Sequence, residues 1–204
     1  ASKHKEISAR FVQNEHGACV GMRTEHKGTQ YFVSQYDPEA YSERFVENIY
    51  NPESDCFIII GFSFGYFLGA FSRVLLAGQR LIVIEPGRAF LLAQLGVHDV
   101  GSAIQKSCLD IIAHENSEHV LHSLRLLFWR YDIRKVTVGF IPAYTNVFER
   151  FCTSLRRGIY QEQEDILCEE KRYSHGCAEI RKNYFNEHGQ MGDLTLFFSR
   201  IEQK

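Results

Sequence analysis

Residues 56–66 read CFIIIGFSFGY and residues 81–87 read LIVIEPG, and these two stretches decide the fold that we expect. Each contains an unbroken apolar run of strand length, which ends at Gly61 in the first and at Glu85 in the second. Unbroken apolar runs are typical of strands that are buried on both faces, as in parallel sheets. The intervening residues 66–76 have the character of a helix. A strand, a helix and a strand in this order predict a parallel β-α-β unit.

The same rhythm continues toward the carboxyl terminus. We expect further strands at 109–113 and 136–141, and further helices at 88–95, 115–129 and 144–157. Alternating strands and helices predict an α/β fold of the Rossmann-like type, in which a mostly parallel sheet carries helices on both faces.

Two segments flank this expected core. Residues 1–36 alternate between apolar and polar positions around two glycine-containing turns, which predicts a small β-hairpin segment. Asp37 and Pro38 then begin a helix, one as its N-cap and the other at its first position. The last segment is charged, lacks a strand pattern and ends in apolar residues at helical spacing, which predicts a helical extension. The expected parts are a β-hairpin segment at 1–36, a Rossmann-like domain at 37–160 and a helical extension at 161–204.

Composition and charge argue against two classes of protein. The chain of 204 residues has a net charge of −2, whereas a nucleic-acid binder shows a basic stripe. No apolar run approaches the ~20 residues of a membrane-spanning helix, and the first ten residues are polar, unlike a signal peptide. The six cysteines include no CxxC pair and are interpreted as reduced thiols, with Cys56 and Cys108 in the core. We therefore expect a soluble cytoplasmic protein that binds neither nucleic acid nor membrane.

The two turns predict where a ligand binds. Ligands of open α/β sheets bind beyond the carboxyl ends of the strands. Glycines at 61 and 65 let the backbone approach a ligand closely, and the helix that follows offers N–H groups to anions or ribose oxygens. Glu85 ends the next strand, where a carboxylate accepts hydrogen bonds from ribose hydroxyls. Since Ser63 replaces the middle glycine of GxGxxG, a nucleoside or a SAM-like ligand is favoured over a dinucleotide. The candidate ligand-binding residues are Gly61, Ser63, Gly65, Tyr66, Glu85 and Tyr144. The plain alternative is a tight turn, with Glu85 facing solvent.

Residues 61–65 also match G-x-S-x-G, the nucleophile turn of α/β hydrolases. A serine esterase using Ser63 would need an acid and a histidine later in the chain. Asp110 or Asp132 would be the acid, and the histidine would be one of the two in the polar tail, at 175 and 188. Neither histidine follows a closing strand, so this enzyme is an alternative and not the preferred interpretation.

The histidines at 114, 119 and 122 have the spacing of ligands on one helix face. Two glutamates, at 115 and 118, stand four residues before His119 and His122. We interpret this pattern as a solvated helix with local charge pairing and expect no metal site.

Four short motifs resemble, in order, those of one family. Residues 34–40 read SQYDPEA, which is similar to the pattern S-x-Y-D-P…E-A. Residues 61–66 read GFSFGY, which is similar to G-x-G-x-G-Y. Residues 82–86 read IVIEP, which is similar to an apolar strand that ends in IEP. A proline-aromatic turn follows a later strand, as in IPAY at 141–144. This arrangement resembles the amino-terminal domain of the motility-associated factor (Maf) glycosyltransferases, which include the flagellin glycosyltransferases. The agreement covers about residues 10–160. Ser63 departs from it, since the family tends to glycine there, and Ala40 follows the acid at once rather than after a couple of residues.

The resemblance implies a function in flagellin glycosylation and motility. Proteins of this family transfer nonulosonic acids from CMP-sugars to Ser or Thr of flagellin in the cytoplasm, and the transfer is attributed to a central domain that follows. Residues 161–204 are too short to be that domain, so we expect an accessory or nucleotide-binding domain whose partners are a central glycosyltransferase domain or flagellin. No catalytic residue is carried over. Two alternatives remain open: a SAM-dependent methyltransferase with Glu85 on the ribose, and an interaction module that uses the amphipathic tail.

Overall fold

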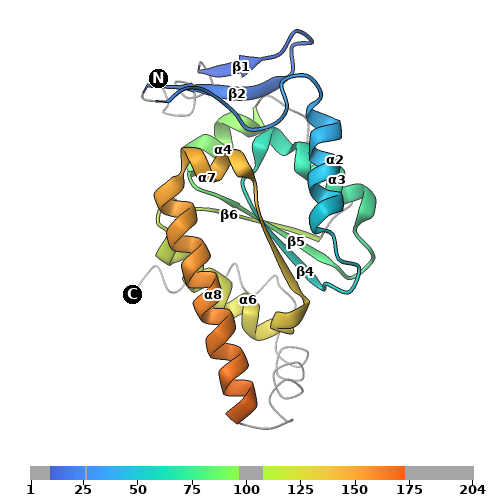
Figure 1. Ribbon diagram of the computed structural model, residues 1–204, viewed down its shortest axis with the longest axis vertical. Coiled ribbons are helices and arrows are strands. Elements are labelled where there is room, and N and C mark those ends of the chain that lie inside the picture. Colours follow the sequence, from blue (N-terminus) through green and yellow to red (C-terminus); the bar gives the residue numbers. More distant parts are fainter. Residues whose placement is uncertain (1–9, 26, 97–107, 173–204) are drawn as a thin grey trace.

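The computed structural model describes residues 10–25, 27–96 and 108–172 and contains two sheets (Figure 1). The first is three-stranded and antiparallel, and the second is four-stranded and parallel, with the order β6-β5-β4-β7. The strands are β1 (Phe11–Gln13), β2 (Cys19–Thr24), β3 (Gly28–Tyr31), β4 (Cys56–Ile60), β5 (Arg80–Glu85), β6 (Cys108–Ala113) and β7 (Val136–Phe140). This is the α/β fold with a parallel sheet that the strand and helix pattern predicts.

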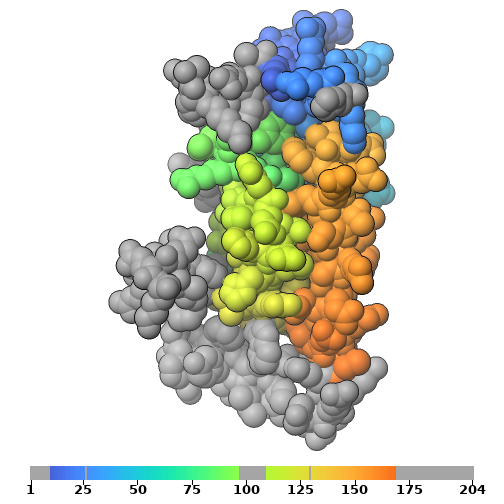
Figure 2. Space-filling model, turned by 90° about the vertical axis from the view of Figure 1, so that its left-hand side faces the viewer, coloured from blue at the N-terminus to red at the C-terminus, as the bar shows by residue number. Residues whose placement is uncertain are grey.

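Helices cover both faces of the parallel sheet (Figure 1). The helices are α2 (Pro38–Ile49), α3 (Tyr66–Val74), α4 (Arg88–Leu95), α6 (Ser117–Arg130), α7 (Pro142–Val147) and α8 (Glu149–Arg172), with short 3-10 turns η1 (Ser63–Gly65) and η2 (Ile133–Lys135). Helices α2 and α3 pack together on one face, and α6 and α8 pack together on the other, where Figure 2 shows them side by side. The Asp37 side chain accepts a hydrogen bond from the Ala40 amide at 2.9 Å, which confirms its predicted role as the N-cap of α2.

The strand order creates a topological switch point beside β4. From β4 the chain moves outward to β5 and β6, and it then returns to place β7 on the other side of β4. Both neighbours pair with β4 in parallel, and residues 56–60 of β4 are all buried. The turn that follows Ile60 and the turn that follows Phe140 therefore diverge from adjacent strand ends, which is where open α/β sheets bind their ligands.

The three-stranded sheet covers this carboxyl edge of the parallel sheet. In Figure 1 it lies above α4 and α7. Phe11 and Phe32 pack on the ring of Phe64 at centroid distances of 5.0 and 6.2 Å. Phe32 also packs on Tyr144 at 5.0 Å. The segment expected as a hairpin thus has a third strand, and its aromatic side chains close the edge at which ligands were expected.

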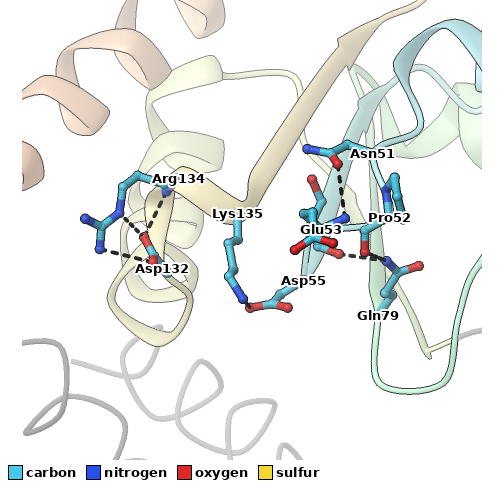
Figure 3. A network of polar contacts seen from close by, with 9 residues as sticks. Asn51, Pro52, Glu53, Asp55, Gln79, Asp132, Arg134 and Lys135 are labelled. Atoms are coloured by element: carbon cyan, nitrogen blue, oxygen red, sulfur yellow. Dashed lines mark hydrogen bonds and ion pairs between the residues drawn. The ribbon is translucent and has the colours of Figure 1, made fainter.

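The opposite, amino edge is closed by polar contacts (Figure 3). Gln79, which precedes β5, donates to the carbonyl oxygens of Pro52 and Ser54 at 3.1 and 2.8 Å. Lys135, which precedes β7, lies 3.9 Å from the carboxylate of Asp55. These contacts hold together the loops that enter neighbouring strands, and they lie at the other end of the sheet from the candidate site.

The helix expected at 144–157 differs from the observed structure. Helix α7 begins at Pro142, and the backbone leaves helical geometry at Phe148, with φ −113° and ψ 44°. Helix α8 begins at the next residue and continues to Arg172. Residues 173–204, with the apolar positions expected in a terminal helix, lie outside the described residues. Within the part of the chain that the structure describes, no helix is both long and apolar enough to cross a membrane.

Candidate functional site

The turn after β4 has an unusual backbone. Gly61 and Gly65 have φ of 117° and 87°, and Ser63 and Phe64 between them have φ of 47° and 57°. Left-handed backbone costs a residue with a Cβ roughly 1–2 kcal/mol. Two such residues in succession persist only where the surrounding structure holds them, and strain of this kind clusters at functional sites.

Tyr144 fills the space beside this turn. A Cβ atom added to Gly61 would lie 2.6 Å from two carbon atoms of the Tyr144 ring. The ring thus lies directly on the Gly61 backbone, a position that only glycine permits. The Tyr144 side chain is fully buried, and Phe32, Phe90 and Phe148 surround it. The crevice at the switch point is therefore filled by a side chain of the protein itself.

Glu85 and the turn meet at this crevice. One carboxylate oxygen, Oε2, accepts hydrogen bonds from the Phe62 amide at 3.0 Å and from the Tyr144 hydroxyl at 2.7 Å. The Tyr144 oxygen in turn accepts from the amides of Phe62 and Ser63, both at 3.2 Å. The predicted proximity of the glycine turn and Glu85 is confirmed, and the alternative that Glu85 faces solvent is wrong, because Glu85 is completely buried.

Burial governs the charge of Glu85. Desolvation raises the pKa of its carboxyl from 4.5 to about 7, against the opposing effect of hydrogen bonds from Tyr144, Phe62 and Gln94. The pKa of Tyr144 is raised well above 10, mainly by desolvation and then by the neighbouring carboxylate. The phenol therefore stays protonated, while Glu85 titrates near neutral pH.

Gln94 is a member of this network that sequence reasoning missed. From α4 it donates to Glu85 Oε2 at 3.1 Å and accepts from the Phe64 amide at 2.9 Å. It is completely buried. The sequence does indicate a buried polar residue here, because Gln94 interrupts the apolar run of residues 89–95. A buried polar side chain normally has a hydrogen-bonding partner in the core.

Two polar atoms of the crevice are left without partners. Ser63 Oγ and Glu85 Oε1 are buried, and neither makes a hydrogen bond within the described residues. An unpaired buried polar atom costs ~1–3 kcal/mol, and native proteins contain few of them.

We call Glu85, Gln94, Tyr144 and the Phe62–Phe64 backbone the Glu85 network.

The structure brings most of the predicted ligand-binding residues together. Gly61, Ser63 and Glu85 each lie against Tyr144, and Gly65 ends the strained turn. Tyr66 points elsewhere, into a separate groove of about 450 Å³ that it lines together with Tyr36 and Asp37. All six residues are buried. Ligand binding by these residues stays a prediction.

An open cleft lies beside the Glu85 network at the same edge of the sheet. Its volume is about 660 Å³, and Pro86, Asn116 and Phe148 contribute to its walls. Pro86 follows Glu85 in the chain, and the Phe148 ring lies 5.4 Å from that of Tyr144. Two bases and two acids also line it: Lys27, Arg150, Glu115 and Glu149. We call this space the edge cleft.

The serine esterase hypothesis gains no support from these positions. Ser63 is fully buried, whereas the nucleophile of an α/β hydrolase is exposed at its turn. Asp110 forms an ion pair with Arg80, and Asp132 caps η2 at the amino edge. The histidines at 175 and 188 lie outside the described residues.

The remaining candidates lie on the surface or in the core. His114 and His119 contact each other through Nε2 and Nδ1 at 3.0 Å. Among the described residues, no group of three or more His, Cys, Asp and Glu side chains has the arrangement of a metal site. Cys19, Cys56 and Cys152 are free and buried, as interpreted for Cys56, while Cys168 is free and exposed. The side chain of Cys108 is not among those described.

No protein-family model matches the chain, and no curated protein matches it significantly. The class that the fold and the site define is therefore a Rossmann-like α/β domain with a crevice closed by Tyr144.

Proposed function

We propose that this chain is an accessory, ligand-binding domain of the Maf type. It would be the amino-terminal Rossmann-like domain of a cytoplasmic glycosyltransferase that transfers a nonulosonic acid from a CMP-sugar to Ser or Thr of flagellin. Its partners would be the central glycosyltransferase domain or flagellin, and its ligand a nucleotide or nucleotide-sugar.

One observation carries the proposal. Three of the segments on which the resemblance rests, residues 61–66, 82–86 and 141–144, are far apart in the chain and converge on the Glu85 network. Each segment ends or follows a strand of the parallel sheet, and their meeting at the carboxyl edge is the arrangement that a ligand-binding domain of this type requires. In addition, an amide of the glycine turn and a carboxylate at the next strand end are the groups with which Rossmann-like proteins hold a nucleoside.

The proposed role is binding rather than catalysis. Glu85 and Tyr144 are the titratable groups of the network, and both are inaccessible to solvent. A general acid or base has to reach the reacting atom of a substrate within hydrogen-bonding distance. Neither side chain lines the open cleft in this arrangement, so we assign the network a binding role.

The edge cleft is the place for the ligand. Its volume of about 660 Å³ falls within the range of ~300–1,000 Å³ that is usual for small-molecule sites. Lys27 and Arg150 supply positive charge for a phosphate, and Glu115 and Glu149 offer acceptors to hydroxyl or amino groups. This mixture fits a ligand of the CMP-sugar class, which has both kinds of group.

A titration followed by two-dimensional NMR tests the proposal. CMP should shift the amide signals of Asn116, Ser117 and Phe148, which line the edge cleft. Arg150→Ala should weaken binding about tenfold, because it removes a charge-assisted contact with phosphate. Arg44→Ala, an exposed arginine on α2, is the matched control and should leave the affinity unchanged.

Three results would speak against the proposal. Shifts confined to other parts of the chain would place the ligand elsewhere. Binding of S-adenosylhomocysteine without binding of CMP would favour the methyltransferase alternative. No binding of either compound would contradict a nucleotide-binding role.

A further inference from the structure

The hydroxyl of Tyr144 makes the contacts that a ligand hydroxyl makes in a nucleoside site. It accepts hydrogen bonds from two successive amides of the glycine turn and donates to the carboxylate at the next strand end. Its ring lies on Gly61, the glycine that allows close approach to the backbone. The phenol therefore occupies the position at which a ligand was expected.

The phenol satisfies this position only in part. One hydroxyl engages Oε2 of Glu85 and leaves Oε1 without a partner within the part of the chain that the structure describes. Ser63 Oγ likewise has no hydrogen-bonding partner among the described residues. Two adjacent hydroxyls would offer one donor to each carboxylate oxygen and a further contact for Ser63. A vicinal diol, as in ribose, thus matches the polar groups of the crevice better than a phenol does.

We propose that the crevice at Gly61, Ser63 and Glu85 is a subsite for the vicinal diol of a ribonucleoside, and that the Tyr144 side chain occupies this subsite as an internal substitute for it. The proposal rests on the proposed function in one respect, since it specifies the part of a nucleotide ligand that the domain reads. When the ligand binds, the phenol leaves and the diol takes over its contacts with the turn and with Glu85.

The position of Tyr144 is compatible with such an exchange. The residue belongs to the six-residue helix α7, which ends at the non-helical Phe148. Phe148 lines the edge cleft, as does Pro86 next to Glu85. A ligand that lies in the edge cleft is thus separated from the subsite by the rings of Tyr144 and Phe148.

Affinity for nucleosides tests the subsite directly. An internal occupant competes with the ligand, because apparent affinity falls with the fraction of binding-competent protein. Tyr144→Ala should therefore bind cytidine at least tenfold more tightly than the unchanged protein does. Cytidine should also bind this variant at least tenfold more tightly than 2′-deoxycytidine, which lacks the diol. Phe128→Ala, which opens a cavity of comparable size under α6, is the control and should gain no affinity.

Two results would overturn the proposal. The first is a folded Tyr144→Ala variant that binds cytidine no more tightly than the unchanged protein. The second is equal binding of cytidine and 2′-deoxycytidine by that variant, because a space that accepts both does not read the diol.

Hydrogen exchange in the unchanged protein provides a test that needs no variant. If the phenol leaves the subsite, the amides of Phe62 and Ser63 should exchange at least tenfold faster than that of Ile59 within β4. Cytidine should then slow them, because the diol replaces the phenol. Exchange of all three amides at one rate, or no response to cytidine at millimolar concentration, would contradict the proposal even where Tyr144→Ala fails to fold.

These results separate the two proposals. CMP that binds the edge cleft while Phe62 and Ser63 stay protected would retain the proposed function and reject the diol subsite. Cytidine that binds Tyr144→Ala with diol selectivity, with no CMP binding by the unchanged protein, would retain the subsite and reject a role in nucleotide-sugar binding.

Discussion

The hydroxyl of Tyr144 donates to the buried carboxylate of Glu85 at 2.7 Å, across 59 positions of the chain. Tyr144 follows β7, and Glu85 ends β5 on the other side of β4. The contact therefore spans the switch point, and the amides of Phe62 and Ser63 from the turn after β4 complete it. We expect the stability of the protein and its pH dependence to depend on this contact.

The titration of Glu85 predicts a pH dependence of stability. In the unfolded chain its pKa is near 4.5, and burial raises it to about 7 in the folded protein. Between these values the folded state keeps a proton that the unfolded state releases, so this contribution is complete below pH 4.5 and is lost as the pH rises to about 7. Its size is on the order of 3 kcal/mol.

The measurement compares Glu85→Gln with the unchanged protein by urea unfolding at pH 5 and pH 8. The unchanged protein should lose about 2–3 kcal/mol in this contribution between pH 5 and pH 8, whereas Glu85→Gln cannot lose it. The free energy of unfolding of the variant, minus that of the unchanged protein, should therefore rise by the same amount. Taking the difference removes the contributions of other carboxyl groups. A difference that is the same at both pH values would show that Glu85 titrates normally.

Removal of the Tyr144 hydroxyl group should lower the free energy of unfolding. Tyr144→Phe keeps the ring but leaves the Ser63 amide unpaired and takes a donor from Glu85. We expect a loss of about 2–3 kcal/mol in the free energy of unfolding, because the groups left behind are buried. Tyr50→Phe is the control: its hydroxyl makes one contact, with Gln79, in a partly buried place, and its loss should cost about 1 kcal/mol or less. Equal effects would mean that the Glu85 network contributes no special stability.

Gly61 should tolerate no side chain while Tyr144 is present. In Gly61→Ala the new Cβ would lie 2.6 Å from the ring of Tyr144, on a backbone with φ of 117°. We expect a loss above about 3 kcal/mol, from strain and steric conflict together. Gly78→Ala shares the positive φ but meets no atom within 4 Å, and should cost about 1–2 kcal/mol.

A double-mutant cycle separates these two causes. In a Tyr144→Ala background the steric part disappears, so Gly61→Ala should cost only about as much as Gly78→Ala does. Additive losses would indicate that the ring does not restrict Gly61.

The ion pair between Arg80 and Asp110 should contribute more to the free energy of unfolding than an exposed ion pair does. It joins β5 to β6, and its side chains are 17% and 31% exposed. Asp110→Ala leaves the guanidinium partly buried without its carboxylate partner, and we expect a loss of about 1–3 kcal/mol. Glu43→Ala breaks the exposed pair with Arg73 and should cost less than about 1 kcal/mol. Chemical unfolding in 0.1 M and 1 M salt provides the check, since only the exposed pair should weaken strongly with salt.

The elements of the fold could be predicted because their signals are local. The unbroken apolar runs at 57–60 and 81–84 indicate buried strands, and Asp37 with Pro38 marks a helix start. The ends of two strands also placed Gly61 and Glu85 at one edge, since parallel strands carry their carboxyl ends on the same side. Local patterns did not predict the break at Phe148, because no glycine or proline stands there; its ring packs on those of Phe90 and Tyr144.

The α/β class, the parallel strands and the meeting of the glycine turn with Glu85 follow from the amino-acid sequence alone. Each of these follows from hydrophobic periodicity and turn chemistry within a few residues. The closure of the crevice depends on the tertiary structure. Tyr144, Gln94 and Phe32 reach it from three segments that lie apart in the chain, and their side-chain directions depend on how those segments pack. A carboxylate at a strand end can face a ligand, water or a tyrosine, and the choice is made by packing over long sequence separations.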